Sequence, residues 1–269
     1  MINKNLIFIK LGGSLITEKD VPNSTRLEVI NGLAKTIRQI SVNYPQYQFV
    51  LGHGSGSFGH HAANKYSTQD GVFTTSQWLG FLDVWQAAHK LNQIVINALT
   101  EVGLPIITFS PSASTTTQNK KIKYWNLIPI KSALSAGFIP LVMGDVVFDS
   151  QIGGTILSTE ELFYHLALEL RPATILIAGI ENGVYADFPD CLHLVPKITQ
   201  TNIDLIIQDI NESQSIDVTG GMRSKVKILM EMSKKVPGLQ ARIFSAVDPK
   251  NIELAIKDEQ IGTLISHLE

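Results

Sequence analysis

The sequence contains one cysteine, Cys191, among its 269 residues. A single thiol cannot close an internal disulfide, so we expect the protein to reside in a reducing compartment. No apolar run approaches the roughly 20 residues that a membrane-spanning helix needs. The apolar segment before Gly12 is too short for a signal peptide with a cleavage site. These absences predict a cytoplasmic protein with no membrane partner.

The sequence also lacks an excess of charge of either sign. The formal net charge is −2, and Lys and Arg form no run that would make a basic stripe for a polyanion. We therefore expect a small-molecule substrate and no nucleic acid partner. With 44% hydrophobic and 17% charged residues, the composition is typical of a globular protein. We expect residues 1–269 to form a single domain.

Short apolar runs alternate with helical patterns and glycine-containing turns. Leu6–Ile9 precedes Gly12 and Gly13, residues 27–40 repeat apolar side chains at helical spacing, and Gln48–Leu51 precedes a second Gly-rich turn. Repeated strand–turn–helix units predict an α/β fold in which helices cover a mostly parallel central sheet.

Four glycine-containing turns are candidates for phosphate binding: Lys10–Ser14, Gly52–His60, Gly144–Asp145 and Asp217–Lys225. Glycine lets backbone N–H groups approach an anion, and the N-terminus of a following helix adds partial positive charge. Turns at the carboxyl ends of parallel strands meet at one edge of the sheet. The pattern predicts a phosphate site there, although no Walker A sequence is present and the dinucleotide fingerprint is matched poorly.

The same turns resemble those of the amino acid kinase superfamily, which includes acetylglutamate, aspartate, glutamate and uridylate kinases. Within it, His53–His60, Gly144–Asp149 and Ser215–Met222 are most similar to the isopentenyl phosphate kinases. The resemblance runs from about Leu6 to Ile265. It implies a three-layer αβα sandwich, a homodimer, and ATP with Mg²⁺ as phosphoryl donor.

The implied reaction is direct phosphoryl transfer from ATP to isopentenyl phosphate, which gives isopentenyl diphosphate. An N-terminal lobe of about 1–150 would bind the acceptor, and a C-terminal lobe of about 151–269 would bind the nucleotide. An isoprenoid tail needs an apolar pocket. Candidate lining residues are Phe73, Trp78, Phe81, Leu82, Trp85, Ile139 and Leu141. Taken singly, each is better explained by an amphipathic helix that packs on the core or on a dimer partner.

The resemblance also implies a role for individual residues. Lys10 bridges the donor and acceptor phosphates, Lys225 holds the β- and γ-phosphates, and Lys19 lies over the transferred group. The implied catalytic set is Lys10, Lys19, His60, Glu160 and Lys225. The implied ATP contacts are Lys10, Gly12, Gly13, Ser14, Gly56, Gly179, Gly220, Gly221 and Lys225. The implied acceptor contacts are Ser55, His60, Gly144 and Asp145, and no protein ligand to a metal is implied.

Two segments depart from the family pattern. The family usually has Ser-Gly-Asp-Asp where this chain has Ser158-Thr159-Glu160-Glu161, so Glu160 must reach the lysines from one methylene further away. The turn Ala178–Gly183, which bears on the nucleotide, is also altered. Other acceptors stay open, namely a longer prenyl phosphate or the phosphonate fosfomycin. A nucleotide-binding protein without turnover is the alternative outside the enzymes.

Overall fold

The computed structural model describes residues 2–18, 21–187, 190–210 and 221–268, without the side chains of residues 60–62 and 64. Its main sheet has eight strands, and among the described residues every neighbouring pair is parallel except β11 with β12. The expected mostly parallel sheet is confirmed. In spatial order the strands are β10 (Lys197–Ile198), β12 (Thr263–Ile265), β11 (Gln240–Ser245), β9 (Pro172–Gly179), β1 (Asn3–Leu11), β2 (Gln48–His53), β6 (Ile139–Met143) and β3 (Ile106–Thr108).

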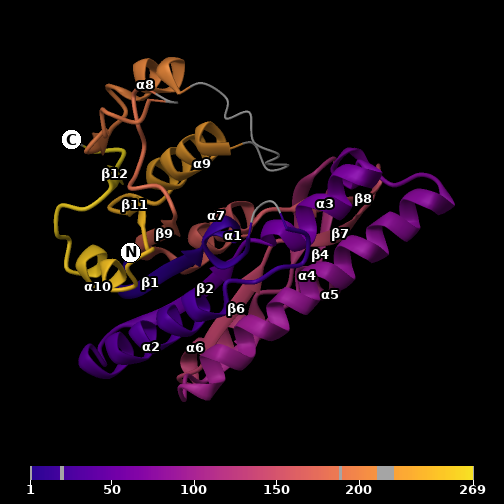
Figure 1. Ribbon diagram of the computed structural model, residues 1–269, viewed down its shortest axis with the longest axis horizontal. Coiled ribbons are helices and arrows are strands. Elements are labelled where there is room, and N and C mark those ends of the chain that lie inside the picture. The colour runs from indigo at the N-terminus through magenta and orange to yellow at the C-terminus, as the bar shows by residue number, and fades with distance from the viewer. Residues whose placement is uncertain (1, 19–20, 188–189, 211–220, 269) are drawn as a thin grey trace.

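Helices cover both faces of this sheet (Figure 1). One face carries α2 (Leu27–Asn43), α4 (Thr75–Glu101) and α10 (Asn251–Ile256). The other face carries α6 (Ile128–Ser135), α7 (Thr159–Leu170), α8 (Ile203–Asp209) and α9 (Gly221–Lys235). The expected three-layer αβα sandwich is therefore confirmed.

Strand β1 shows why the opening of the sequence is a continuous apolar run. Ile7 and Ile9 pack with α2 and α4, whereas Leu6 and Phe8 pack on the opposite face with α7. Successive side chains of a strand point to opposite faces. A central strand covered on both faces therefore needs apolar residues at every position.

A second sheet of four strands lies beside α3 (Gly56–Tyr66) and α4, at the end of the molecule opposite α8 (Figure 1). Its strands, in order, are β5 (Lys121–Trp125), β4 (Thr115–Gln118), β7 (Asp145–Asp149) and β8 (Gly153–Leu157). The polar sequence of Ser112–Lys120 by itself predicts a loop or hairpin tip. The structure instead includes β4 there, because Thr115 and Thr117 are buried. Asn119 and Lys120 do form the hairpin tip.

The short elements are α1 (Gly13–Ile16), a 3₁₀ turn at Thr68–Asp70 and α5 (Pro111–Ser114). The sequence predicts a long helix from about Ser76 to Val102, before Gly103 and Pro105. Helix α4 confirms it, and a capping box between Thr74 and Gln77 fixes its start. Within the described ranges, no helix has both the length and the apolar character needed to cross a bilayer.

Candidate active site

Two Gly-rich turns meet at the carboxyl ends of the neighbouring strands β1 and β2. Gly54 donates its N–H to the carbonyl of Leu11 at 3.1 Å. A Cβ on Gly13 would lie 2.5 Å from the backbone nitrogen of Gly56, which itself has a φ of +49°. Only glycine allows this approach and this backbone conformation without strain. The predicted juxtaposition of the two turns is confirmed.

Gly52, which pairs with Lys10 in the sheet, lies under the first turn of α7. A Cβ at Gly52 would lie 2.6 Å from Cγ2 of Thr159 and 2.9 Å from the ring of Phe163. The missing side chain therefore lets α7 approach the sheet closely. This approach brings Glu160, the second residue of α7, to the end of β1.

Lys10 and Glu160 form an ion pair, and both side chains are almost completely buried, with exposures of 7% and 6%. Burial alone would raise the pKa of the Glu160 carboxyl, but the charges of Lys10 and Lys225 outweigh burial and hold that pKa below its usual value. Lys225 lies in the first turns of α9, close enough for its charge to act on Glu160. Two lysines and one carboxylate therefore share the site, which leaves a net positive charge for an anion.

The neighbouring Glu161 has a different task. Its carboxylate accepts hydrogen bonds from the backbone N–H and the hydroxyl of Ser158, at 2.7 and 2.9 Å, and so closes a capping box at the start of α7. Burial raises the pKa of Glu161, and the bonds from Ser158 oppose that shift only in part. Of the two glutamates that replace the usual Asp pair, Glu160 faces the lysines and Glu161 caps the helix.

Gly144 and Asp145 connect β6 to β7 beside the second turn. Gly144 donates its N–H to the carbonyl of His53 at 3.1 Å. The carboxylate of Asp145 accepts from the backbone N–H of Val146 at 2.9 Å and of Ser112 at 3.1 Å. Nε2 of His89 lies 3.4 Å from the same carboxylate. These groups serve the protein itself, and the acceptor-binding role of Gly144 and Asp145 stays a prediction.

The remaining predicted site residues differ in what the structure describes. Ser14 lies in α1, Gly179 ends β9, and Gly221 begins α9, all beside the turns described above. Ser55 lies between β2 and α3. Lys19 and Gly220 lie outside the described residues, as does the side chain of His60, whose backbone is part of α3. The roles predicted for all these residues stay predictions.

The aromatic residues of α4 form a cluster that also includes a ring from the small sheet. The ring centroids of Trp78, Phe81 and Phe148 lie 5.2–5.9 Å apart. Leu141, in contrast, is fully buried in the core beneath α2 and α4. This burial is the core packing that was the alternative for these residues, and a contact of Leu141 with an isoprenoid tail stays a prediction.

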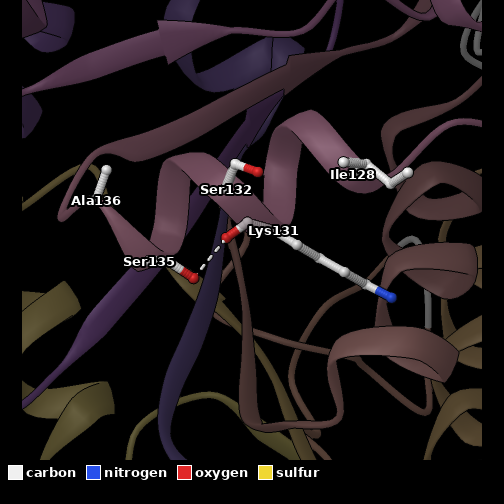
Figure 2. A pocket seen from close by; sticks show the side chains of 5 residues that line it. All are labelled: Ile128, Lys131, Ser132, Ser135 and Ala136. Atoms are coloured by element: carbon white, nitrogen blue, oxygen red, sulfur yellow. Dashed lines mark hydrogen bonds between the residues drawn. The ribbon is translucent and has the colours of Figure 1, made fainter.

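A shallow groove elsewhere on the surface contains no predicted site residue. It follows helix α6 and is lined by Ile128, Lys131, Ser132, Ser135 and Ala136 (Figure 2). Its polar groups bind within the protein: Ser135 donates to the carbonyl of Lys131, and Nζ of Lys131 contacts Glu169, both at 3.0 Å. The groove is therefore separate from the candidate site.

Known proteins share sequence and fold with this chain. Residues 5–245 match the amino acid kinase family. The chain belongs to the amino acid kinase family. The isopentenyl phosphate kinase of Methanocaldococcus jannaschii is 31% identical over 98% of this chain and all of its own length. That of Methanothermobacter thermautotrophicus is 30% identical over 97% of this chain and 99% of its own length. A crystal structure of isopentenyl phosphate kinase, 29% identical, superposes with a TM-score of 0.82 over 97% of this chain and 100% of that one.

The match to the amino acid kinase family spans both strand-end turns, Glu160 and Lys225. One residue of this site was not assigned a role from the sequence. His53 is 1% exposed at the end of β2. The available signal was its spacing, since Phe49, Leu51 and His53 alternate on one face of the strand and the first two are core residues.

Proposed function

We propose that this protein transfers the γ-phosphoryl group of ATP to isopentenyl phosphate. An oxygen of the acceptor phosphate forms a bond to the γ-phosphorus while the bond from that phosphorus to the β–γ bridging oxygen breaks. The products are isopentenyl diphosphate and ADP. The observation that carries this proposal is the buried Lys10–Glu160 pair at the meeting point of two Gly-rich turns, with Lys225 beside it.

Phosphoryl transfer depends mainly on positioning and on neutralising charge, because the donor and the acceptor are both anions. Glu160 holds Lys10 in a fixed position, from which its ammonium group faces the phosphate that moves. Lys225 neutralises charge on the β- and γ-phosphates. Backbone N–H groups of the turns at Gly12–Gly13 and Ser55–Gly56 complete the cradle, and His60 recognises the phosphate that the acceptor already carries.

Mg²⁺ is expected to enter with ATP. This ion is often held by substrate phosphates with one or two carboxylates. Within the described ranges, no three His, Cys, Asp or Glu side chains gather in a way that would hold a metal, and Glu160 is engaged with Lys10. The residues present therefore fit a metal bound mainly by the nucleotide, whose charge would add to that of the lysines.

Two further properties belong to the same proposal. We expect residues up to about 150 to bind the acceptor and the later residues to bind ATP, in a homodimer located in the cytoplasm. Light scattering of the purified protein would measure its oligomeric state.

The exposed rings of Trp78 and Phe148 offer apolar surface that suits an isoprenoid chain better than a small polar phosphonate.

The deciding experiment follows ADP release with Mg-ATP and one of three acceptors: isopentenyl phosphate, geranyl phosphate or fosfomycin. We expect the fastest turnover with isopentenyl phosphate. Lys10→Met should lower kcat by about 100- to 1,000-fold, as expected when one charged contact to a transition state is removed. Lys4→Met, on the exposed first part of the same strand, is the matched control and should keep its activity. Equal turnover of Lys10→Met and wild type would contradict the proposal.

A further inference from the structure

His53 occupies a buried position at the carboxyl end of β2, one residue before the turn at Gly54–Gly56. It pairs with Leu11 of β1 and with Met143 of β6, so it lies on the sheet face that α4 covers. Neighbouring residues of this strand on that face, Phe49 and Leu51, are apolar. An imidazole at the next inward position must find polar partners or destabilise the fold.

The ring of His53 has a polar partner at each nitrogen. Nδ1 lies 3.1 Å from the carbonyl oxygen of Gly54, and Nε2 lies 3.0 Å from Oδ1 of Asn92 on α4. The other end of the Asn92 amide lies 3.1 Å from the hydroxyl of Thr108, at the end of β3. A chain of three side chains thus connects the Gly54 carbonyl to a helix and to the edge strand of the main sheet.

The backbone of His53 joins further parts of the site. Its carbonyl oxygen accepts from the N–H of Gly144 at 3.1 Å and from the hydroxyl of Thr159 at 2.7 Å. Thr159 directly precedes Glu160, the partner of Lys10. His53 therefore contacts the Gly54–Gly56 turn through its ring. Through its carbonyl it contacts Gly144 and the start of α7.

The ring is suited to positioning and not to proton transfer. Burial lowers the pKa of His53, and the nearby charge of Lys10 lowers that pKa further, against the opposing effect of the two ring contacts. A neutral imidazole donates at one nitrogen and accepts at the other. The carbonyl of Gly54 can only accept, so Nδ1 carries the proton and donates to it. Nε2 then accepts from the NH₂ group of Asn92, whose amide oxygen in turn accepts from the hydroxyl of Thr108, an orientation that swaps the O and N positions of the amide.

We propose that His53, held by Asn92 and Thr108, is a positioning residue that fixes the Gly54–Gly56 turn against Lys10 and Gly13 for binding of the acceptor phosphate. This inference rests on the proposed function, because the turn is the expected acceptor cradle. The nucleotide lysine Lys225 lies on the other face of the sheet with α9. Loosening the hydrogen-bonded chain of His53, Asn92 and Thr108 should therefore weaken binding of the acceptor phosphate more than binding of ATP.

The test uses Asn92→Leu, which removes the polar partner of the ring and keeps the number of side-chain heavy atoms. We expect the KM for isopentenyl phosphate to rise about tenfold, the effect of one lost hydrogen bond, with the KM for ATP within twofold of wild type. Asn97→Leu, which breaks an exposed bond to Gln93 on the same helix, is the control and should leave both constants unchanged. Thr108→Val, a milder change, should raise the acceptor KM about threefold.

A residue that only stabilised the core would give a different pattern. Asn92→Leu would then lower the melting temperature while both KM values stayed at their wild-type levels, and that result would overturn the inference. A parallel rise of both KM values would overturn it as well.

A second measurement separates this inference from the proposed function. If wild type releases no ADP with any acceptor, the proposed function is wrong, and hydrogen exchange then decides about His53. Amides of residues 54–58 should exchange at least tenfold faster in Asn92→Leu and at the wild-type rate in Asn97→Leu. Unchanged exchange in Asn92→Leu would show that His53 does not hold the turn.

Discussion

Two buried carboxylates, Glu160 beside the end of β1 and Asp149 at the end of β7, stay ionised for different reasons. Glu160, in the candidate active site, is held charged by two lysines. Asp149, in the small sheet, accepts hydrogen bonds from the backbone N–H groups of Asn119, Lys120, Gln151 and Ile152 at 2.9–3.1 Å. Burial opposes ionisation of Asp149, but these N–H donors and Thr117 hold its pKa well below the usual range.

We interpret Glu160 as a carboxylate with a role in the reaction and Asp149 as a carboxylate that stabilises the fold. Backbone donors cannot move away from Asp149, so they form a fixed junction between the β4–β5 tip and the β7–β8 turn. A lysine ammonium has three N–H donors, so Lys10 can keep its contact with Glu160 and still bind a phosphate when a substrate arrives. A buried ion pair adds little net stability, which is consistent with a functional reason for Glu160.

The largest expected effect is a loss of activity when Glu160 is changed. Glu160→Gln should lower kcat about 100-fold, because Lys10 loses the anion that orients it and favours its charged form. Steady-state ADP release measures this effect. Glu160→Asp, which keeps the charge, should recover part of the rate.

A converse change at Asp149 should affect stability and spare catalysis. Asp149→Asn replaces one acceptor oxygen by an NH₂ group that faces backbone donors, so we expect the free energy of unfolding to fall by about 2 kcal/mol. Turnover of the folded enzyme should stay within twofold of wild type. Urea unfolding and ADP release, measured on the same preparation, check the two statements. A large loss of kcat would show that the junction at Asp149 also supports the active site.

The pH dependence of stability sharpens the same comparison. An unfolded Asp titrates near pH 3.9, and the folded pKa of Asp149 lies lower. The stabilisation from this carboxylate is therefore fully present above about pH 4 and is lost as the pH falls below that value. Wild type should lose more unfolding free energy than Asp149→Asn between pH 6 and pH 3. Parallel losses in both proteins would contradict this account.

The smallest expected effect is that of changing Glu161, the neighbour of Glu160. Glu161→Gln keeps an oxygen that can accept from Ser158, so the capping box persists. We expect a change of at most about 0.5 kcal/mol in the free energy of unfolding and no change in kcat. A fall in kcat comparable to that of Glu160→Gln would show that both glutamates act on the lysines.

Much of this arrangement could be predicted from sequence because it depends on local pattern. Apolar runs before Gly12 and Gly52 indicated buried parallel strands, and parallel strands place their terminal turns at one edge. The segment 115–118 could not be predicted in this way. Its threonines are typical of a polar loop, and they form a strand only because they pair with β5 and β7. The task of His53 was also hidden, since Asn92 lies 39 residues away.

The sequence by itself determined the layered α/β architecture, the two strand-end turns and the identity of the lysines near them, because periodicity and glycine placement act over a few residues. Tertiary structure alone decided which glutamate meets Lys10, which one caps α7, and which side chain holds the ring of His53. These choices depend on how closely α7 and α4 approach the sheet. That distance is set by contacts such as Gly52 against Thr159, between residues far apart in the chain.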